Sequence, residues 1–190
     1  MDVPLNQLLA FCRPGFESEA GRELTDAAAT TGAWGYFTPQ PGPGWLRFTL
    51  AGGLDAPSLL RQVPLESLVF VRDWQVLLAE MPLPAKDRVG AVVEVLSDGG
   101  AELVRNCARV DVRVGENSSD PDLGRFARKW VAPLSRALRG AGLLGAEVDS
   151  SVGDRLEILL PDFGSALIGM SLANNRARWP MGIPRLKLPA

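Results

Sequence analysis

The chain has 190 residues, of which 46% are hydrophobic and 22% charged, and a formal net charge of −2. This profile is typical of a globular protein and excludes a disordered one, and the length allows one ordinary domain or two small ones. The sequence contains no histidine. This excludes Ser/His/Asp and Cys/His relays and histidine-ligated metals, so we do not expect an independent hydrolase.

Compartment and redox state are predicted from two further features. No apolar run approaches the roughly 18–20 residues that a membrane helix needs, and the N-terminus lacks a signal-peptide pattern, so we expect a cytoplasmic protein with no membrane partner. Cys12 and Cys107 lie far apart in the sequence. Buried free thiols are expected there, and neither a disulfide nor a metal site is expected.

The charge is unevenly distributed along the chain. Residues 1–99 carry 7 basic and 12 acidic side chains, whereas residues 100–190 carry 13 and 10. The two halves are therefore expected to face different partners.

The first part of the chain predicts the order strand, helix, strand, strand, helix, strand, over residues 7–12, 16–31, 34–38, 45–50, 55–62 and 67–78. This βαββαβ order is the ferredoxin-like arrangement. The Pro/Gly-rich residues 39–44 predict a hairpin loop; a phosphate-binding loop is disfavoured because no helix start follows. Glu17, Glu19 and Glu23 are interpreted as a solvated acidic helix face.

Residues 81–84 (MPLP) interrupt the pattern and place a domain boundary near residue 80, dividing the chain into residues 1–80 and 81–180. A helix is expected over 87–96. Residues 108–115 alternate, with three valines on one face and Arg109, Asp111 and Arg113 on the other, which predicts a half-buried strand. Residues 155–160 and 165–172 are expected to form a hairpin.

A basic helix is predicted over residues 123–146. Leu123, Phe126, Ala127, Trp130, Leu134, Leu138 and Ala141 share one face, and the opposite face carries a basic row, defined as Arg125, Arg128, Lys129, Arg136 and Arg139. Pro133 is expected to kink or break the helix. The range contains no acid to pair with the basic row, which favours phosphate binding, although a solvated face stays open.

The last twenty residues contain four basic side chains, no acid and three prolines. Arg176, Arg178, Arg185 and Lys187 supply the charge, and the prolines exclude a helix interior. This tail is interpreted as an extended strap between domains or as an RNA contact. Trp179 is a candidate for stacking on a base, with core packing as the alternative.

Three stretches resemble a known family. Residues 11–17 (FCRPGFE), the helical residues 126–139 including their proline, and residues 181–187 (MGIPRLK) preceded by 171–175 (SLANN) are similar to RlmM. This is the bacterial family of 23S ribosomal RNA ribose 2′-O-methyltransferases. The resemblance extends, with gaps, over essentially the whole chain.

The resemblance implies an α+β chain: a ferredoxin-like domain, then a THUMP-type RNA-binding domain. Residues 181–190 would begin the linker to a C-terminal methyltransferase domain that methylates a cytidine ribose of 23S rRNA with S-adenosylmethionine. It implies no catalytic residue, cofactor or metal site within these 190 residues. Arg128, Lys129, Arg136 and Arg139 match family positions as RNA-facing candidates, and Arg125 and the four basic tail residues complete the predicted interface.

The sequence thus predicts the RNA-recognition half of an rRNA methyltransferase, which alone is not an enzyme. The alternative hypothesis is a ferredoxin-like module for protein–protein interaction or dimerisation, with a merely solvated basic face.

Overall fold

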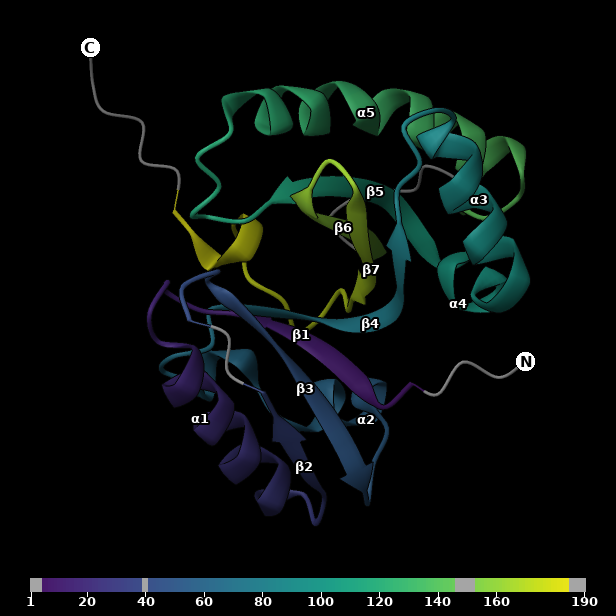
Figure 1. Ribbon diagram of the computed structural model, residues 1–190. Coiled ribbons are helices and arrows are strands. Elements are labelled where there is room, and N and C mark those ends of the chain that lie inside the picture. Colours follow the sequence, from purple (N-terminus) through teal and green to yellow (C-terminus); the bar gives the residue numbers. More distant parts are fainter. Residues whose placement is uncertain (1–4, 39–40, 146–152, 185–190) are drawn as a thin grey trace.

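The computed structural model describes residues 5–38, 41–145 and 153–184, and it contains helices packed around the outside of one curled sheet (Figure 1). The first half consists of β1 (Gln7–Phe11), α1 (Glu17–Thr30), β2 (Trp34–Phe37), β3 (Trp45–Gly52), α2 (Ala56–Gln62), the 3-10 helix η1 (Leu65–Ser67) and β4 (Asp73–Pro82). The second half consists of α3 (Arg88–Gly99), α4 (Ala101–Val104), β5 (Cys107–Val114), α5 (Pro121–Gly140), β6 (Asp154–Asp162), β7 (Ser165–Ser171) and the 3-10 helix η2 (Pro180–Gly182).

The seven strands form a single sheet in the order β2-β3-β1-β4-β7-β6-β5. The first four strands pair antiparallel and have the predicted ferredoxin-like βαββαβ connectivity. In the second half, β6 and β7 form the predicted hairpin, and β5 pairs parallel with β6 through the crossover helix α5. β4 pairs with β1 on one side and β7 on the other, so it belongs to both halves. The boundary predicted near residue 80 falls inside this shared strand.

The two faces of the sheet differ. Its outer face packs against the helices: Leu24 of α1, Leu59 of α2, Val92 of α3 and Trp130 of α5 belong to one continuous core. In Figure 1, α1 and α2 cover the lower end of the sheet and α3 and α5 the upper end.

The inner face contains a second, smaller core of Leu9, Phe11, Leu77, Leu159 and Leu167, against which Trp45 and Met181 pack. The curl of the sheet closes this core. Arg113 on β5 reaches Asp73 on β4 across two intervening strands, with 3.1 Å between Nη1 and Oδ2. A register shift between Leu77 and Ala79 of β4 accompanies the curl.

The start of β4 differs from the prediction. A strand was expected over 67–78, but residues 65–67 form η1 and β4 begins only at Asp73. The cause lies on α1, where the Glu23 carboxylate accepts hydrogen bonds from the backbone N–H groups of Val69, Phe70 and Val71. These donors are therefore not available for a strand ladder.

The interpretation of the acidic face of α1 was wrong for two of its three residues. Glu17 is buried and accepts hydrogen bonds from the backbone N–H groups of Gly15 and Gly44, the latter at 2.8 Å. Burial favours a raised pKa for Glu17, but these hydrogen bonds outweigh it and the pKa is lowered. Glu23 holds the loop before β4, and only Glu19 is exposed as predicted.

Other local predictions have mixed outcomes. Cys12 and Cys107 are free and buried as predicted, and burial raises the pKa of each thiol to about 12. The short helix α4 was not predicted. Asp55 caps α2 by accepting from Ser58 N at 2.8 Å, which explains where that helix begins. Within the described ranges no helix is long and apolar enough to span a membrane.

Candidate nucleic-acid interface

The candidate interface is built on α5, whose ends are set by local chemistry. The Asp120 side chain accepts from Asp122 N at 2.9 Å and Pro121 occupies the first turn, as is common at helix starts. The helix ends at Gly140, six residues before the prediction, because Gly142 adopts φ 69° and Leu143 N donates back to Leu138 O. Pro133 does not break it. Pro133 is exposed, so the carbonyl that loses its partner faces solvent.

The predicted apolar stripe of α5 is the buried one. Leu123, Ala127, Trp130, Leu134 and Leu138 are buried, whereas Ala141 is exposed, contrary to the prediction. Phe126 is half-buried and stacks on Trp130 with 5.3 Å between ring centroids. This packing fixes which side of α5 faces outward.

Four members of the basic row lie on the outward side. Arg125, Arg128, Lys129 and Arg136 are exposed. Arg125 forms an ion pair with Asp122, an acid one residue before the predicted range that was not counted in the prediction. Arg139 differs from the other four because it is half-buried and donates from Nη2 to Ala108 O at 3.2 Å. One nitrogen of its guanidinium is therefore already hydrogen-bonded near the start of β5.

A groove of about 580 Å³ runs between α5 and β5, the last strand of the sheet. Arg128 lines it from α5, Arg109 and Arg113 from β5, and Met181 from η2. Arg109 forms a salt bridge with Asp111 at 2.6 Å, so part of the positive charge of β5 is neutralised. Of the basic row, Arg128 borders this groove.

The described part of the tail is attached to the first half. Asn175 donates from Nδ2 to Leu60 O and Val63 O and accepts from Leu65 N through Oδ1 at 2.7 Å. Its backbone oxygen accepts from Trp74 Nε1 at 2.9 Å. Sequence reasoning missed Asn175, and the paired asparagines at 174–175 carry no local signal that distinguishes it. These bonds fix the course of the segment that carries Arg176 and Arg178.

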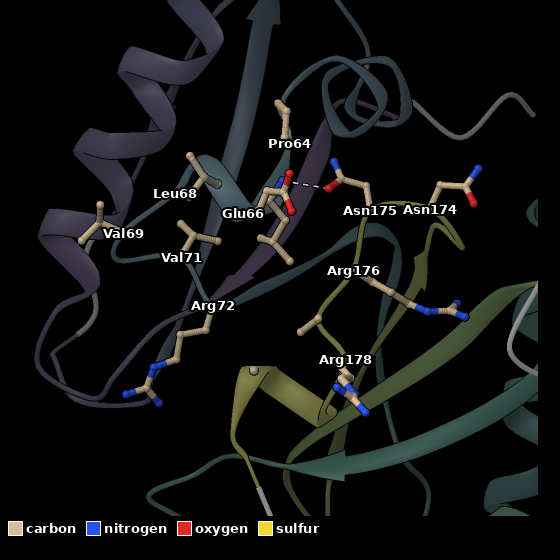
Figure 2. Close-up of a pocket in the computed structure, with 13 residues that line it drawn as sticks. Pro64, Glu66, Leu68, Val69, Val71, Arg72, Asn174, Asn175, Arg176 and Arg178 are labelled. Atoms are coloured by element: carbon tan, nitrogen blue, oxygen red, sulfur yellow. Dashed lines mark hydrogen bonds between the residues drawn. The ribbon is translucent and has the colours of Figure 1, made fainter.

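A hollow of about 520 Å³ lies between this segment and residues 64–72 (Figure 2). Arg72, Arg176 and Arg178 line it, but Figure 2 shows their guanidinium groups pointing in different directions. The three arginines therefore form a basic rim, not a convergent anion site.

The tail residues have different environments. Arg176 is half-buried, and its Nη1 donates to Gly153 O at 2.9 Å; burial and then Arg155 lower its pKa. Arg178 is exposed, 5.3 Å from the ring centroid of Trp179. Arg185 and Lys187 lie outside the described residues. The structure thus brings together the exposed part of the basic row on α5, whereas Arg178 lies in the segment that precedes η2.

A buried ionic cluster lies behind this surface. Arg113 was predicted to share the exposed face of a half-buried strand, which is wrong: it is 8% exposed and bonds Asp73 and Glu157, the latter at 2.6 Å. The reason is the curl, which buries the inner face of β5. Asp73 also accepts from Ala177 N at 3.0 Å, so the cluster ties the tail to both halves.

Comparisons with known proteins define the class. The family model described as "RlmM ferredoxin-like domain" matches residues 5–75, and "Ribosomal RNA large subunit methyltransferase M, N-terminal" matches residues 87–172. The fold is that of a ferredoxin-like domain followed by a THUMP-type α/β domain, and the second matching model describes the N-terminal part of its family.

The chain belongs to the RlmM family. It is 54% identical over 187 residues to ribosomal RNA large subunit methyltransferase M of Marinobacter nauticus, covering 98% of this chain and 52% of that protein. The protein of the same name from Ectopseudomonas mendocina is 35% identical, with 97% and 50% covered. The chain therefore spans about half the length of the curated relatives it matches.

Solved structures agree on the fold. The crystal structure of TrmN from Thermus thermophilus matches with a TM-score of 0.53 and 16% identity over 86% of this chain and 44% of that one. PH1313 from Pyrococcus horikoshii matches with a TM-score of 0.51 and 9% identity over 90% and 55%.

Proposed function

We propose that this chain is the RNA-recognition half of an S-adenosylmethionine-dependent 23S rRNA ribose 2′-O-methyltransferase. It binds structured rRNA through the exposed basic side of α5 and presents the target cytidine to a C-terminal catalytic domain in the cytoplasm. The observation that carries the proposal is the exposure of Arg125, Arg128, Lys129 and Arg136 together on one helix of an RlmM-family chain.

Electrostatics supports α5 rather than the rest of the surface. Phosphates attract clusters of basic side chains, and each neutralised phosphate releases counterions, which makes binding depend on salt. Arg128, Lys129 and Arg136 are exposed and lie on the same side of one helix. Arginine adds bidentate geometry for phosphate oxygens. Residues 1–99 are net acidic, and no helix among their described residues carries a comparable row of exposed basic side chains.

The division of labour follows from the chemistry. A ribose 2′-hydroxyl is present on every nucleotide, so selectivity must come from positioning the substrate rather than from the reacting group. In this proposal, S-adenosylmethionine and the methyl transfer belong to the catalytic domain, and the residues of this chain bind and orient RNA.

The test measures RNA affinity against salt concentration. The triple variant Arg128→Gln/Lys129→Gln/Arg136→Gln should bind a 20-base-pair RNA hairpin more weakly. The slope of log K against log[salt] should become shallower by about 2–3 units, roughly one for each lost phosphate contact.

The matched control is Arg22→Gln/Arg61→Gln/Arg105→Gln, which removes the same charge from three other exposed arginines. If both triple variants reduced the slope equally, α5 would not be the interface. The tail is tested by Arg178→Gln, which should reduce the slope by at most one unit.

A further inference from the structure

The edge strand β2 presents two large aromatic side chains on the face that carries no helix. Trp34 is 63% exposed and Tyr36 is 58% exposed. Phe37, between them and the loop, belongs instead to the outer core with α1. The strand has no charged residue, although unprotected edge strands usually carry one.

Strand register places polar groups beside Tyr36. Tyr36 is opposite Thr49 on β3, and Thr49 is opposite Gln7 on β1, whose Nε2 donates to the Thr49 hydroxyl at 3.3 Å. Arg47 and Trp45 follow on the same face of β3. Because cross-strand partners share a face, these side chains form one continuous surface.

The curl of the sheet completes a hollow at this surface. Glu80, from the end of β4, forms an ion pair with Arg47 of β3, although β1 separates the two strands. The hollow has a volume of about 290 Å³ and is lined by Tyr36, Thr38, Trp45, Arg47, Thr49 and Glu80. The side chains of Arg47 and Glu80 remain 35% and 56% exposed.

The chemistry of the hollow fits an unpaired nucleobase. Aromatic rings stack on base faces, guanidinium groups donate to base acceptors, and carboxylates accept from exocyclic amines. Tyr36, Arg47 and Glu80 supply one group of each kind. Arg47 and Glu80 neutralise each other, so this hollow has no surplus charge for a phosphate, in contrast to α5.

We propose that this hollow holds an unpaired base of the RNA, stacked on Tyr36 with its edge toward Arg47 and Glu80, while Trp34 stacks on a neighbouring base. The inference rests on the proposed function and assigns the inner face of the ferredoxin-like part a role that α5 does not have. Phosphates bound at α5 supply affinity, and the hollow recognises a single-stranded segment of the substrate.

A second copy of the chain is a poorer occupant. Pairing through β2 would use a strand of only four residues, roughly 13 Å long. Stable dimers bury about 1,200–2,000 Å².

The experiment compares two RNA probes with the 190-residue chain: a fluorescein-labelled single-stranded 8-mer of mixed sequence and a blunt 20-base-pair duplex. Tyr36→Ala should weaken binding of the 8-mer about tenfold and leave the duplex unchanged. Tyr36→Phe keeps the ring and should stay within about threefold of the parent. Phe16→Ala, which removes an exposed aromatic ring that does not line the hollow, is the matched control.

The outcomes separate the two proposals. Equal 8-mer affinity for Tyr36→Ala and the parent overturns the base-binding proposal. If the α5 triple variant loses duplex binding while Tyr36→Ala binds the 8-mer as the parent does, the proposed function is supported and the base-binding proposal is overturned. Sedimentation that shows a dimer lost on Tyr36→Ala assigns the surface to a second copy and also overturns the proposal. Thermal unfolding of each variant checks that it is folded.

Discussion

The hydrogen bonds of Asn175 predict that Asn175→Ala lowers the free energy of unfolding much more than Asn174→Ala does. Its amide donates to Leu60 O and Val63 O at 2.5 and 2.6 Å and accepts from Leu65 N at 2.7 Å. All three partners are backbone groups after or near the end of α2. Asn175→Ala would remove all three hydrogen bonds and leave these groups without a protein partner.

The magnitude follows from the count of bonds. A hydrogen bond contributes about 0.5–1.5 kcal/mol net, and an unsatisfied buried group costs more. Open hollows border Asn175 on both sides, so water can reach part of the site and reduce the loss. We expect Asn175→Ala to lower the free energy of unfolding by about 2 kcal/mol, and Tm by roughly 4–8 °C for a chain of this size.

Asn174→Ala is the control. The Asn174 side chain is exposed and points away from Asn175 in Figure 2. Substitutions at such positions change stability by about 0.5 kcal/mol or less. Urea unfolding would measure the free energy of unfolding of both variants, provided that the m-value is unchanged. Equal midpoints for Asn174→Ala and Asn175→Ala would refute the reasoning.

Three further predictions concern buried or backbone-bound charges. Burial raises the pKa of Glu157 to about 7. Between pH 5 and 7 the folded state therefore holds a proton that the unfolded state has lost, so Tm should fall over this range and level off above it. Glu157→Gln should abolish this dependence of Tm on pH. Arg113→Leu should cost about 3–5 kcal/mol in urea unfolding, because Asp73 and Glu157 would be left buried without their cation; a cost under 1 kcal/mol would contradict this. Glu23→Gln should speed tryptic or chymotryptic cleavage within residues 64–72 at least severalfold, since the carboxylate holds three N–H groups there; unchanged cleavage would show that this loop is held by other contacts.

Local patterns were sufficient to predict the order of the ferredoxin-like elements and the buried side of α5. Turn residues and apolar periodicity predicted the βαββαβ order, and Leu123, Trp130 and Leu138 are buried as the helical period required. These features depend on residues close together in the chain, which is why a single sequence contains them.

Features that depend on distant contacts could not be predicted. Alternation correctly placed Arg113 opposite the valines of β5, but it could not indicate that the sheet curls and buries both faces. Arg139 has the right helical angle for the basic row, yet its partner Ala108 O is 31 residues away. Asn175 bonds residues more than 100 positions earlier. The RNA contacts of α5 and the tail remain predictions.

The shared strand β4 also sets a fixed spacing. β2 and β5 lie at opposite ends of one hydrogen-bonded sheet, six strand intervals apart, or about 29 Å measured along the sheet. No flexible linker interrupts this path, so the hollow beside Tyr36 and the groove beside α5 are held at a fixed separation. Under the two proposals, an RNA that engages both surfaces would have to present its unpaired base and its phosphates at the separation set by the sheet, so substrates would be selected by their dimensions.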